Sequence, residues 1–147
     1  SRGLGDVYKR QAMLATKHYL SQSDVQKILD AANKHAEAHN WAVTIAVCDE
    51  GGHMIGLIRR DGCAPLSAYI AQEKARTAAM GKRETRVYEE IINNGRHAFL
   101  SAPHVSGMLE GGVNIEVNGH TIGAVGVSGV KSAEDAATAK AGIAAIL

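Results

Sequence analysis

The sequence is poor in aromatic residues and cysteines and carries almost no net charge. Aromatic residues make up 4% of the 147 residues, too few for a platform on which nucleic-acid bases stack. The 16 basic and 15 acidic residues leave a formal charge of +1, so neither nucleic acid nor an anionic membrane is expected as a partner. The two cysteines, Cys48 and Cys63, match neither a disulfide framework nor a zinc motif, and no apolar run reaches the ~18 residues of a membrane span. We therefore expect a protein of the reducing cytoplasm.

The first twelve residues differ from the rest of the chain. Ser1–Gln11 (SRGLGDVYKRQ) shows neither a helical nor a strand-like period and no apolar stretch of the kind found in signal peptides. We predict that residues 1–12 are either a non-native fusion or a native disordered tail, and that their deletion leaves melting temperature and assembly unchanged. The length and the 46% hydrophobic content predict a single domain over residues 13–147.

The pattern after residue 20 opens with a helix and a hairpin. Ser21 and Asp24 have the spacing of a capping box, which predicts a helix that ends near Asn40. The β-branched runs 42–48 and 53–59 predict a hairpin whose first strand is covered on both faces. The apolar face of the helix is predicted to consist of Val25, Ile28, Leu29, Ala32 and Ala36.

The remaining elements complete an α/β fold with the order α-β-β-α-α-β-β-α. This order predicts one antiparallel sheet against which the helices pack. The Asn118-Gly119 dipeptide is a strong signal for a hairpin turn. The predicted elements are helices over 66–80 and 86–93, a loop over 94–110, strands over 113–117 and 120–127, and a last helix from a second capping box at Ser132–Asp135 to an inward Leu147.

The helix over 66–80 has two different faces. One face carries large residues, namely Leu66, Tyr69, Ile70, Glu73, Thr77 and Met80. The opposite face carries alanines, namely Ala71, Ala75, Ala78 and Ala79. Because alanine lets another backbone approach closely, we predict that this helix is buried on both sides and that its alanines lie near another subunit. Ala75→Glu would then dissociate the assembly or make the protein insoluble.

Histidines are the natural candidates for metal ligands. His53 follows a double-glycine turn and His104 borders the irregular loop, so either could coordinate haem iron through a neutral imidazole. A single histidine in a loop is more often only solvated, and both assignments stay open. His35 and His39 lie four residues apart on the first helix, where a position at the edge of the core is more frequent than a metal pair.

Charged residues gather where the second strand ends and the long helix begins, among them Arg59 and Asp61. Lys74 lies at the edge of the large-residue face of that helix. Together with Arg59 or Arg76, Lys74 could hold a ligand carboxylate. The alternative is a salt bridge, for which the candidate partners of Lys74 are Glu73, Asp61 and Glu84.

Gly123 and Gly126 leave the last predicted strand thin. We therefore predict a cleft between segment 60–77 and segment 122–127, close to a subunit boundary, in which a flat ligand lies. The glycines at 123, 126 and 129 form GxxGxxG rather than GxGxxG, and they lie within and after a strand. A dinucleotide site is accordingly not expected.

Four stretches carry a family resemblance: AVTIAVCDEGG at 42–52, RDGCAPLSAYIAQEKART at 60–77, EGGVNI at 110–115 and IGAVGVSGV at 122–130. In combination they resemble the GlcG/HbpS family of haem-degrading or haem-binding domains related to the C-terminal part of PduO. The similarity extends from about Leu20 to Leu147. Asn114 is a departure, because the family usually has proline at this position.

The resemblance implies a profilin-like α/β sandwich that forms homo-oligomers, from dimers up to an octamer, and that binds haem or a related tetrapyrrole as cofactor in some members of the family. It places Lys74, Arg76 and Thr77 on a helix motif of the family and Asp61 on its DG motif, which favours the ligand-binding interpretation of Lys74. Catalysis is left open. Two alternatives remain: an enzyme acting on a small hydroxy or oxo acid linked to glycolate metabolism, and an oligomeric accessory protein without ligand.

Overall fold

The computed structural model describes residues 3, 5 and 13–147, so the prediction for residues 1–12 lies almost wholly outside the described residues. The observed order confirms the predicted α-β-β-α-α-β-β-α succession and adds one short 3-10 helix, η1, within the predicted loop. The elements are α2 (Gln22–Ala38), β1 (Thr44–Asp49), β2 (Met54–Arg59), α3 (Leu66–Gly81), α4 (Thr85–Asn93), η1 (His97–Ser101), β3 (Gly112–Val117), β4 (His120–Ser128) and α5 (Ser132–Ile143).

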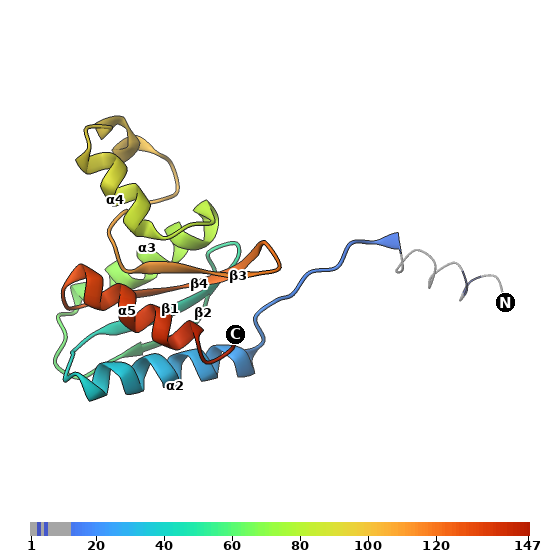
Figure 1. Ribbon diagram of the computed structural model, residues 1–147, viewed down its shortest axis with the longest axis horizontal. Coiled ribbons are helices and arrows are strands. Elements are labelled where there is room, and N and C mark those ends of the chain that lie inside the picture. Colours follow the sequence, from blue (N-terminus) through green and yellow to red (C-terminus); the bar gives the residue numbers. More distant parts are fainter. Residues whose placement is uncertain (1–2, 4, 6–12) are drawn as a thin grey trace.

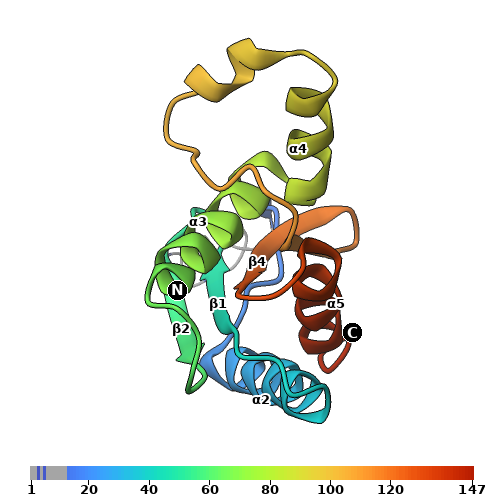
Figure 2. The ribbon, with the colours of Figure 1, turned by 90° about the vertical axis from the view of Figure 1, so that its left-hand side faces the viewer.

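The four strands form one antiparallel sheet in the order β2-β1-β4-β3. Each hairpin pairs its own two strands, and β1 pairs with β4 to join the hairpins, so that Ala46 lies between Leu57 and Gly126. Asn118 and Gly119 adopt φ values of 51° and 80°, the left-handed backbone of a tight hairpin turn. Helices cover both faces: α3 lies on one face, and α2 and α5 lie on the other (Figures 1 and 2).

The larger part of the core lies between the sheet and helices α2 and α5. The predicted capping box starts α2: Ser21 Oγ accepts a hydrogen bond from Asp24 N at 3.1 Å, and the Asp24 carboxylate accepts one from Ser21 N at 3.0 Å. The apolar face of α2 is buried as predicted, with Val25, Ile28, Leu29, Ala32 and Ala36 inside. Both faces of β1 are also covered, as predicted.

The smaller part of the core lies between α3 and the sheet and consists mostly of alanine. Ala71, Ala75 and Ala78 are fully buried against the sheet of their own chain. The prediction that the alanine face lies near another subunit is therefore wrong, because alanine permits the close approach of α3 to β1 and β4. Ala75→Glu is now expected to disrupt the fold itself. On the opposite face Leu66 is 62% and Tyr69 72% accessible, whereas Thr77 is fully buried, so this face is buried only in part within the chain.

The last helix differs from its prediction at both ends. Lys131 rather than Ser132 is the N-cap of α5, and the Glu134 carboxylate accepts a hydrogen bond from Lys131 N at 3.3 Å. Asp135 therefore does not close the capping box and turns into the protein instead. The helix ends at Ile143, and Leu147, which was predicted to face inward, is 69% exposed.

Helix α4, η1 and the loop that returns to β3 form an arm that projects beyond the sheet (Figures 1 and 2). Two buried threonines fasten the arm to the body. Thr77 Oγ1 accepts a hydrogen bond from Gly107 N at 3.2 Å, and Thr85 Oγ1 accepts one from Gly112 N at 2.8 Å. The arm therefore stays attached at its base through side chains of α3 and α4.

Candidate functional site

The cleft predicted between residues 60–77 and β4 is filled by protein. A Cβ atom added to Gly126 would lie 2.0 Å from Ala71 O, because the backbone of α3 occupies that space. A Cβ atom added to Gly123 would lie 2.4 Å from Cys48 O in the neighbouring strand. Both glycines allow close packing of backbones. Ligand contact by Gly123 or Gly126 stays a prediction. In this structure, atoms of the same chain occupy the space beside both glycines.

Lys74 lies inside the fold. Its side chain is 4% exposed, and Nζ donates hydrogen bonds to Val127 O at 2.9 Å and to Asp135 Oδ2 at 3.2 Å. Burial raises the pKa of the Asp135 carboxyl, while the Lys74 ammonium and the hydrogen bond from Val130 N act in the opposite direction. Of the two interpretations of Lys74, the salt bridge is the one observed. Its partner, Asp135, was not among the predicted candidates.

Arg76 and Thr77 are also occupied within the chain. Arg76 pairs with Glu73 one turn earlier, and its Cγ lies directly beneath Gly52. Thr77 is fully buried and holds the arm. Residues 74 and 76 lie on opposite sides of a helix, so the structure does not bring Lys74 and Arg76 together. Ligand binding by these residues stays a prediction.

Arg59 and Asp61 lie at the end of β2, where both are exposed. They line a shallow cavity of about 250 Å³ together with Asn33, Ile58 and Arg60. The Arg60 guanidinium in this cavity donates a hydrogen bond to Asn33 Oδ1 at 2.6 Å. The cavity does not contain Lys74, so the predicted pairing of Arg59 with Lys74 around one carboxylate is not present.

The two histidines predicted as haem ligands lie in separate exposed loops. His53 follows the β1–β2 turn, and its Nδ1 lies 3.2 Å from Asp49 Oδ1. Burial raises the pKa of the Asp49 carboxyl, but hydrogen bonds from the backbone N–H groups of His53 and Gly51 outweigh burial and hold it below its usual value. His104 lies in the loop after η1 with φ 64°. Iron ligation by His53 or His104 stays a prediction.

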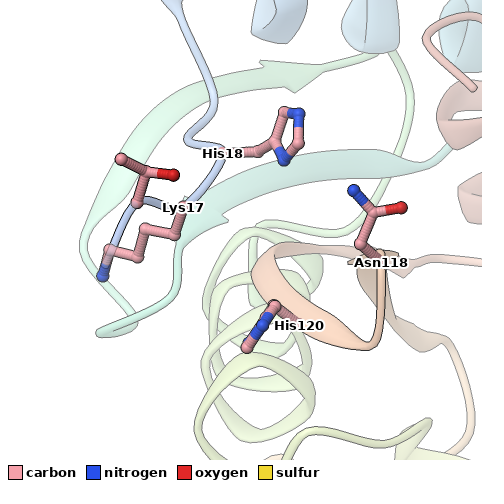
Figure 3. Close-up of a pocket in the computed structure, with 5 residues that line it drawn as sticks. Lys17, His18, Asn118 and His120 are labelled. Atoms are coloured by element: carbon pink, nitrogen blue, oxygen red, sulfur yellow. The ribbon is translucent and has the colours of Figure 1, made fainter. Parts of the chain in front are cut away.

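Two other histidines meet at a cavity that the sequence did not indicate. A hollow of about 320 Å³ is lined by Thr16, Lys17, His18, Asn118 and His120. Figure 3 shows His18 on the extended segment before α2 and His120 on the β3–β4 hairpin, on opposite sides of the hollow. Both imidazoles are exposed. The segment that carries His18 is held in place by the ion pair of Lys17 with Glu50 in the β1–β2 turn.

A second hollow continues the first one. It measures about 310 Å³ and shares Lys17 and His120 with the first hollow. Its other lining residues are Glu50, Ala79, Met80, Lys82, Thr121 and Ile122. We refer to the two hollows together as the His groove. The groove thus combines two imidazoles and two lysine ammonium groups with three apolar residues, Ala79, Met80 and Ile122, of which Met80 is the exposed one.

The donor set of the His groove suits a flat, anionic, metal-containing ligand. Neutral imidazole is a frequent axial ligand of haem iron, and lysine ammonium groups pair with carboxylates. His120 directly follows a predictable turn, but nothing in the sequence links it to His18, which is about a hundred positions away. Their proximity comes from the tertiary structure alone.

Within residues 3, 5 and 13–147, no group of three or more histidine, cysteine, aspartate or glutamate side chains is arranged to hold a metal ion. A metal in the His groove would therefore need ligands of its own, as a porphyrin supplies. In the same described part of the chain, no helix is long and apolar enough to cross a membrane.

The comparisons with known proteins agree with one another. Protein GlcG of Escherichia coli (strain K12) is 56% identical over 115 residues, which cover 78% of this chain and 85% of that protein. A double mutant of Streptomyces reticuli HbpS has a TM-score of 0.80 at 27% identity, covering 91% of each chain. A PduOC:heme complex has a TM-score of 0.79 at 26% identity, covering 88% of this chain and 96% of that chain.

The family assignment rests on nearly the whole folded part of the chain. The match begins just before α2 and ends just after α5, so it includes both hairpins and the arm. Residues 20–144 match the family described as haem degrading protein HbpS-like, and the chain belongs to this HbpS-like family.

Proposed function

We propose that this chain binds haem or a related tetrapyrrole in the His groove. The observation that carries the proposal is the placement of His18 and His120 at one hollow, next to a second hollow that Met80 and two lysines line. The family description and the heme complex of the structural neighbour PduOC support the same ligand class. Within the groove, the two imidazoles are the residues that would hold the iron.

The lysines of the groove are placed to pair with the carboxylate groups of such a ligand. Lys17 and Lys82 both line the second hollow, and haem carries two propionate groups. Each charge-assisted hydrogen bond is worth about 1.5–3 kcal/mol, which corresponds to at least about tenfold in affinity. Lys82→Ala should therefore weaken hemin binding by about tenfold and leave the binding of hemin dimethyl ester almost unchanged. Lys17→Ala should weaken the binding of both, because Lys17 also pairs with Glu50 and so holds the segment that carries His18.

A hemin titration tests the proposed function. Purified protein is titrated with hemin while the Soret band is recorded, and saturable binding with a shifted band is expected. His18→Ala or His120→Ala should abolish the shift or weaken binding at least tenfold. His97→Ala is the matched control, since His97 is an exposed histidine of η1 outside the groove-lining residues.

The same titration distinguishes the groove histidines from His53 and His104, the iron ligands predicted from the sequence. If His53→Ala or His104→Ala loses the Soret shift while both groove variants bind as the unmodified chain does, the iron lies elsewhere and the groove is not the site. If the unmodified chain shows no saturable binding, the proposed ligand class is wrong. Retained binding of metal-free protoporphyrin by the groove variants would show that the lost interaction is with iron.

We also propose that the protein acts as a homo-oligomer in the cytoplasm. The free and buried state of Cys48 and Cys63 supports a reducing compartment. The exposed large side chains Leu66, Tyr69 and Met80 on the outer face of α3 support contact with another protein surface. Sedimentation velocity on the untagged chain tests the assembly.

A further inference from the structure

The segment before α2 depends on one ion pair for its position. Residues 13–19 are all exposed, and Leu20 after them is buried. Between residues that the structure describes, the pair of Lys17 with Glu50 is the only hydrogen bond or ion pair that residues 14–19 make. His18 directly follows Lys17 on this segment (Figure 3). The position of the His18 imidazole therefore depends on Glu50, which lies 33 positions after Lys17.

The β1–β2 turn that carries Glu50 is fixed in two ways. Asp49 Oδ1 accepts hydrogen bonds from the backbone N–H groups two and four residues later, at 2.9 Å and 3.0 Å, which closes the turn around Glu50. The turn also packs on α3, because a Cβ atom added to Gly52 would lie 2.6 Å from Arg76 Cγ. Glu50 is thus a firm support to which the exposed segment is attached.

The charge of Glu50 is unfavourable for the proposed ligand. Its carboxylate lines the second hollow together with Lys17 and Lys82. A carboxylate at this place repels an acidic ligand, so its removal would strengthen the binding of such a ligand if Glu50 influenced the groove through its charge alone. A contribution through Lys17 has the opposite sign, because removal of Glu50 then releases the segment. The direction of the effect therefore distinguishes the two roles.

We propose that Glu50 is a positioning residue of the His groove, which pairs with Lys17 and thereby holds His18 opposite His120. The inference rests on the proposed function, which assigns these two imidazoles to the iron. An exposed ion pair changes an equilibrium constant by up to about fivefold. Glu50 raises the fraction of molecules in which His18 is in place, and the apparent affinity for the ligand follows that fraction.

Trypsin tests the position of the segment without hemin. Trypsin cleaves after lysine, and the pairing of Lys17 with Glu50 protects the bond between Lys17 and His18, because cleavage follows the population of the open form. Glu50→Gln should accelerate cleavage at this bond about two- to threefold, as measured by mass spectrometry. Glu84→Gln is the matched control, since Glu84 pairs with Lys140 and lies outside the groove-lining residues. Equal cleavage rates in Glu50→Gln and the unmodified chain would overturn the proposal.

A double-mutant cycle tests whether Glu50 acts through His18. The probe is hemin dimethyl ester, whose blocked carboxylates remove most of the direct charge effect of Glu50. Glu50→Gln should weaken its binding about two- to fivefold, and the charge exchange Lys17→Glu/Glu50→Lys should recover most of the affinity. In the His18→Ala background the same Glu50→Gln substitution should have no effect, because no imidazole is left to position. Equal weakening in both backgrounds, or none in either, would refute the positioning role.

The failure of this inference can be distinguished from the failure of the proposed function. If the unmodified chain shows no saturable binding of hemin, the proposed function is wrong, and the trypsin comparison still decides whether Glu50 holds the segment. If the unmodified chain binds hemin with a shifted Soret band and Glu50→Gln binds both hemin and its dimethyl ester equally well, only the role of Glu50 is refuted. Glu84→Gln should match the unmodified chain in both titrations.

Discussion

Replacing Lys74 by methionine should strongly destabilise the protein. The substitution keeps the length of the side chain and removes the ammonium that donates to Val127 O and Asp135 Oδ2. The Asp135 carboxylate then stays behind in a site where its side chain is 3% exposed. Removal of one partner from a buried ion pair costs about 3–5 kcal/mol, mostly through the uncompensated charge that remains.

The free-energy cost of Lys74→Met can also be calculated from the protonation of Asp135. This calculation gives a similar value and predicts that the cost depends on pH. Without Lys74 the least costly state of Asp135 is the protonated one. Protonation at pH 7 of a carboxyl with an ordinary value of 3.8 costs about 4 kcal/mol at 1.36 kcal/mol per pH unit. At pH 5 the same step costs about 2.7 kcal/mol less. The deficit of Lys74→Met should therefore shrink as the pH falls from 7 to 5.

The assay is urea unfolding followed by circular dichroism, at equal protomer concentrations because assembly contributes to apparent stability. Lys140→Met is the control, since Lys140 is 57% exposed and pairs with Glu84 at the surface, where such pairs contribute about 0–1 kcal/mol. Lys74→Met/Asp135→Asn removes the buried charge and should recover about half of the loss or more. A deficit below about 1 kcal/mol for Lys74→Met, equal to that of Lys140→Met, would refute a structural role for the ion pair.

Three further outcomes follow from the packing and the titrating groups. Gly126→Ala should destabilise the protein by about 1–3 kcal/mol in the same urea assay, because the new Cβ would lie 2.0 Å from Ala71 O; unchanged stability would show that α3 can move away. Burial and a neighbouring histidine lower the pKa of His35, so the unfolded chain takes up more protons than the folded chain below pH 6.5. Stability should therefore fall from pH 7.5 to 5.5, and it should fall less in His35→Gln. Equal slopes of stability against pH in the two proteins would contradict this. A thiol reagent should label Cys63 before Cys48. Burial raises the pKa of Cys63, but side-chain hydrogen bonds outweigh burial and hold it below its usual value, whereas burial raises the pKa of Cys48 to about 12. Cys63→Ser should remove the fast phase, and labelling of Cys48 first would contradict the assignment.

The parts of the fold that depend on nearby residues could be predicted from the sequence. The capping box of Ser21 and Asp24 forms as expected because both partners lie within four residues. The turn at Asn118-Gly119 likewise needs only the left-handed backbone of those two residues. The second capping box was placed one residue too late, since Ser132, Glu134 and Asp135 offer two overlapping registers and only the buried pairing of Asp135 decides between them.

The parts of the site that depend on distant residues could not be predicted in the same way. Lys74 and Asp135 are 61 positions apart, and no local pattern joins them. His18 and His120 meet because the segment before α2 passes the β3–β4 hairpin. The alanine face of α3 signalled a close approach correctly, but alanine does not specify which backbone approaches, and the prediction chose another subunit where the sheet of the same chain lies.

The tight layer between α3 and the sheet determines where a ligand can bind. Small residues on both sides let α3 approach until its backbone contacts β4 at Gly126, so a flat ligand cannot enter between them without displacing the helix. The opposite face of the sheet is filled by the core under α2 and α5. The His groove lies instead where elements end, beside the end of α3 and the tip of the β3–β4 hairpin. Its walls are the segment before α2, the end of α3 and the tip of the β3–β4 hairpin, whereas the buried Lys74–Asp135 pair lies near the other end of β4, at Val127.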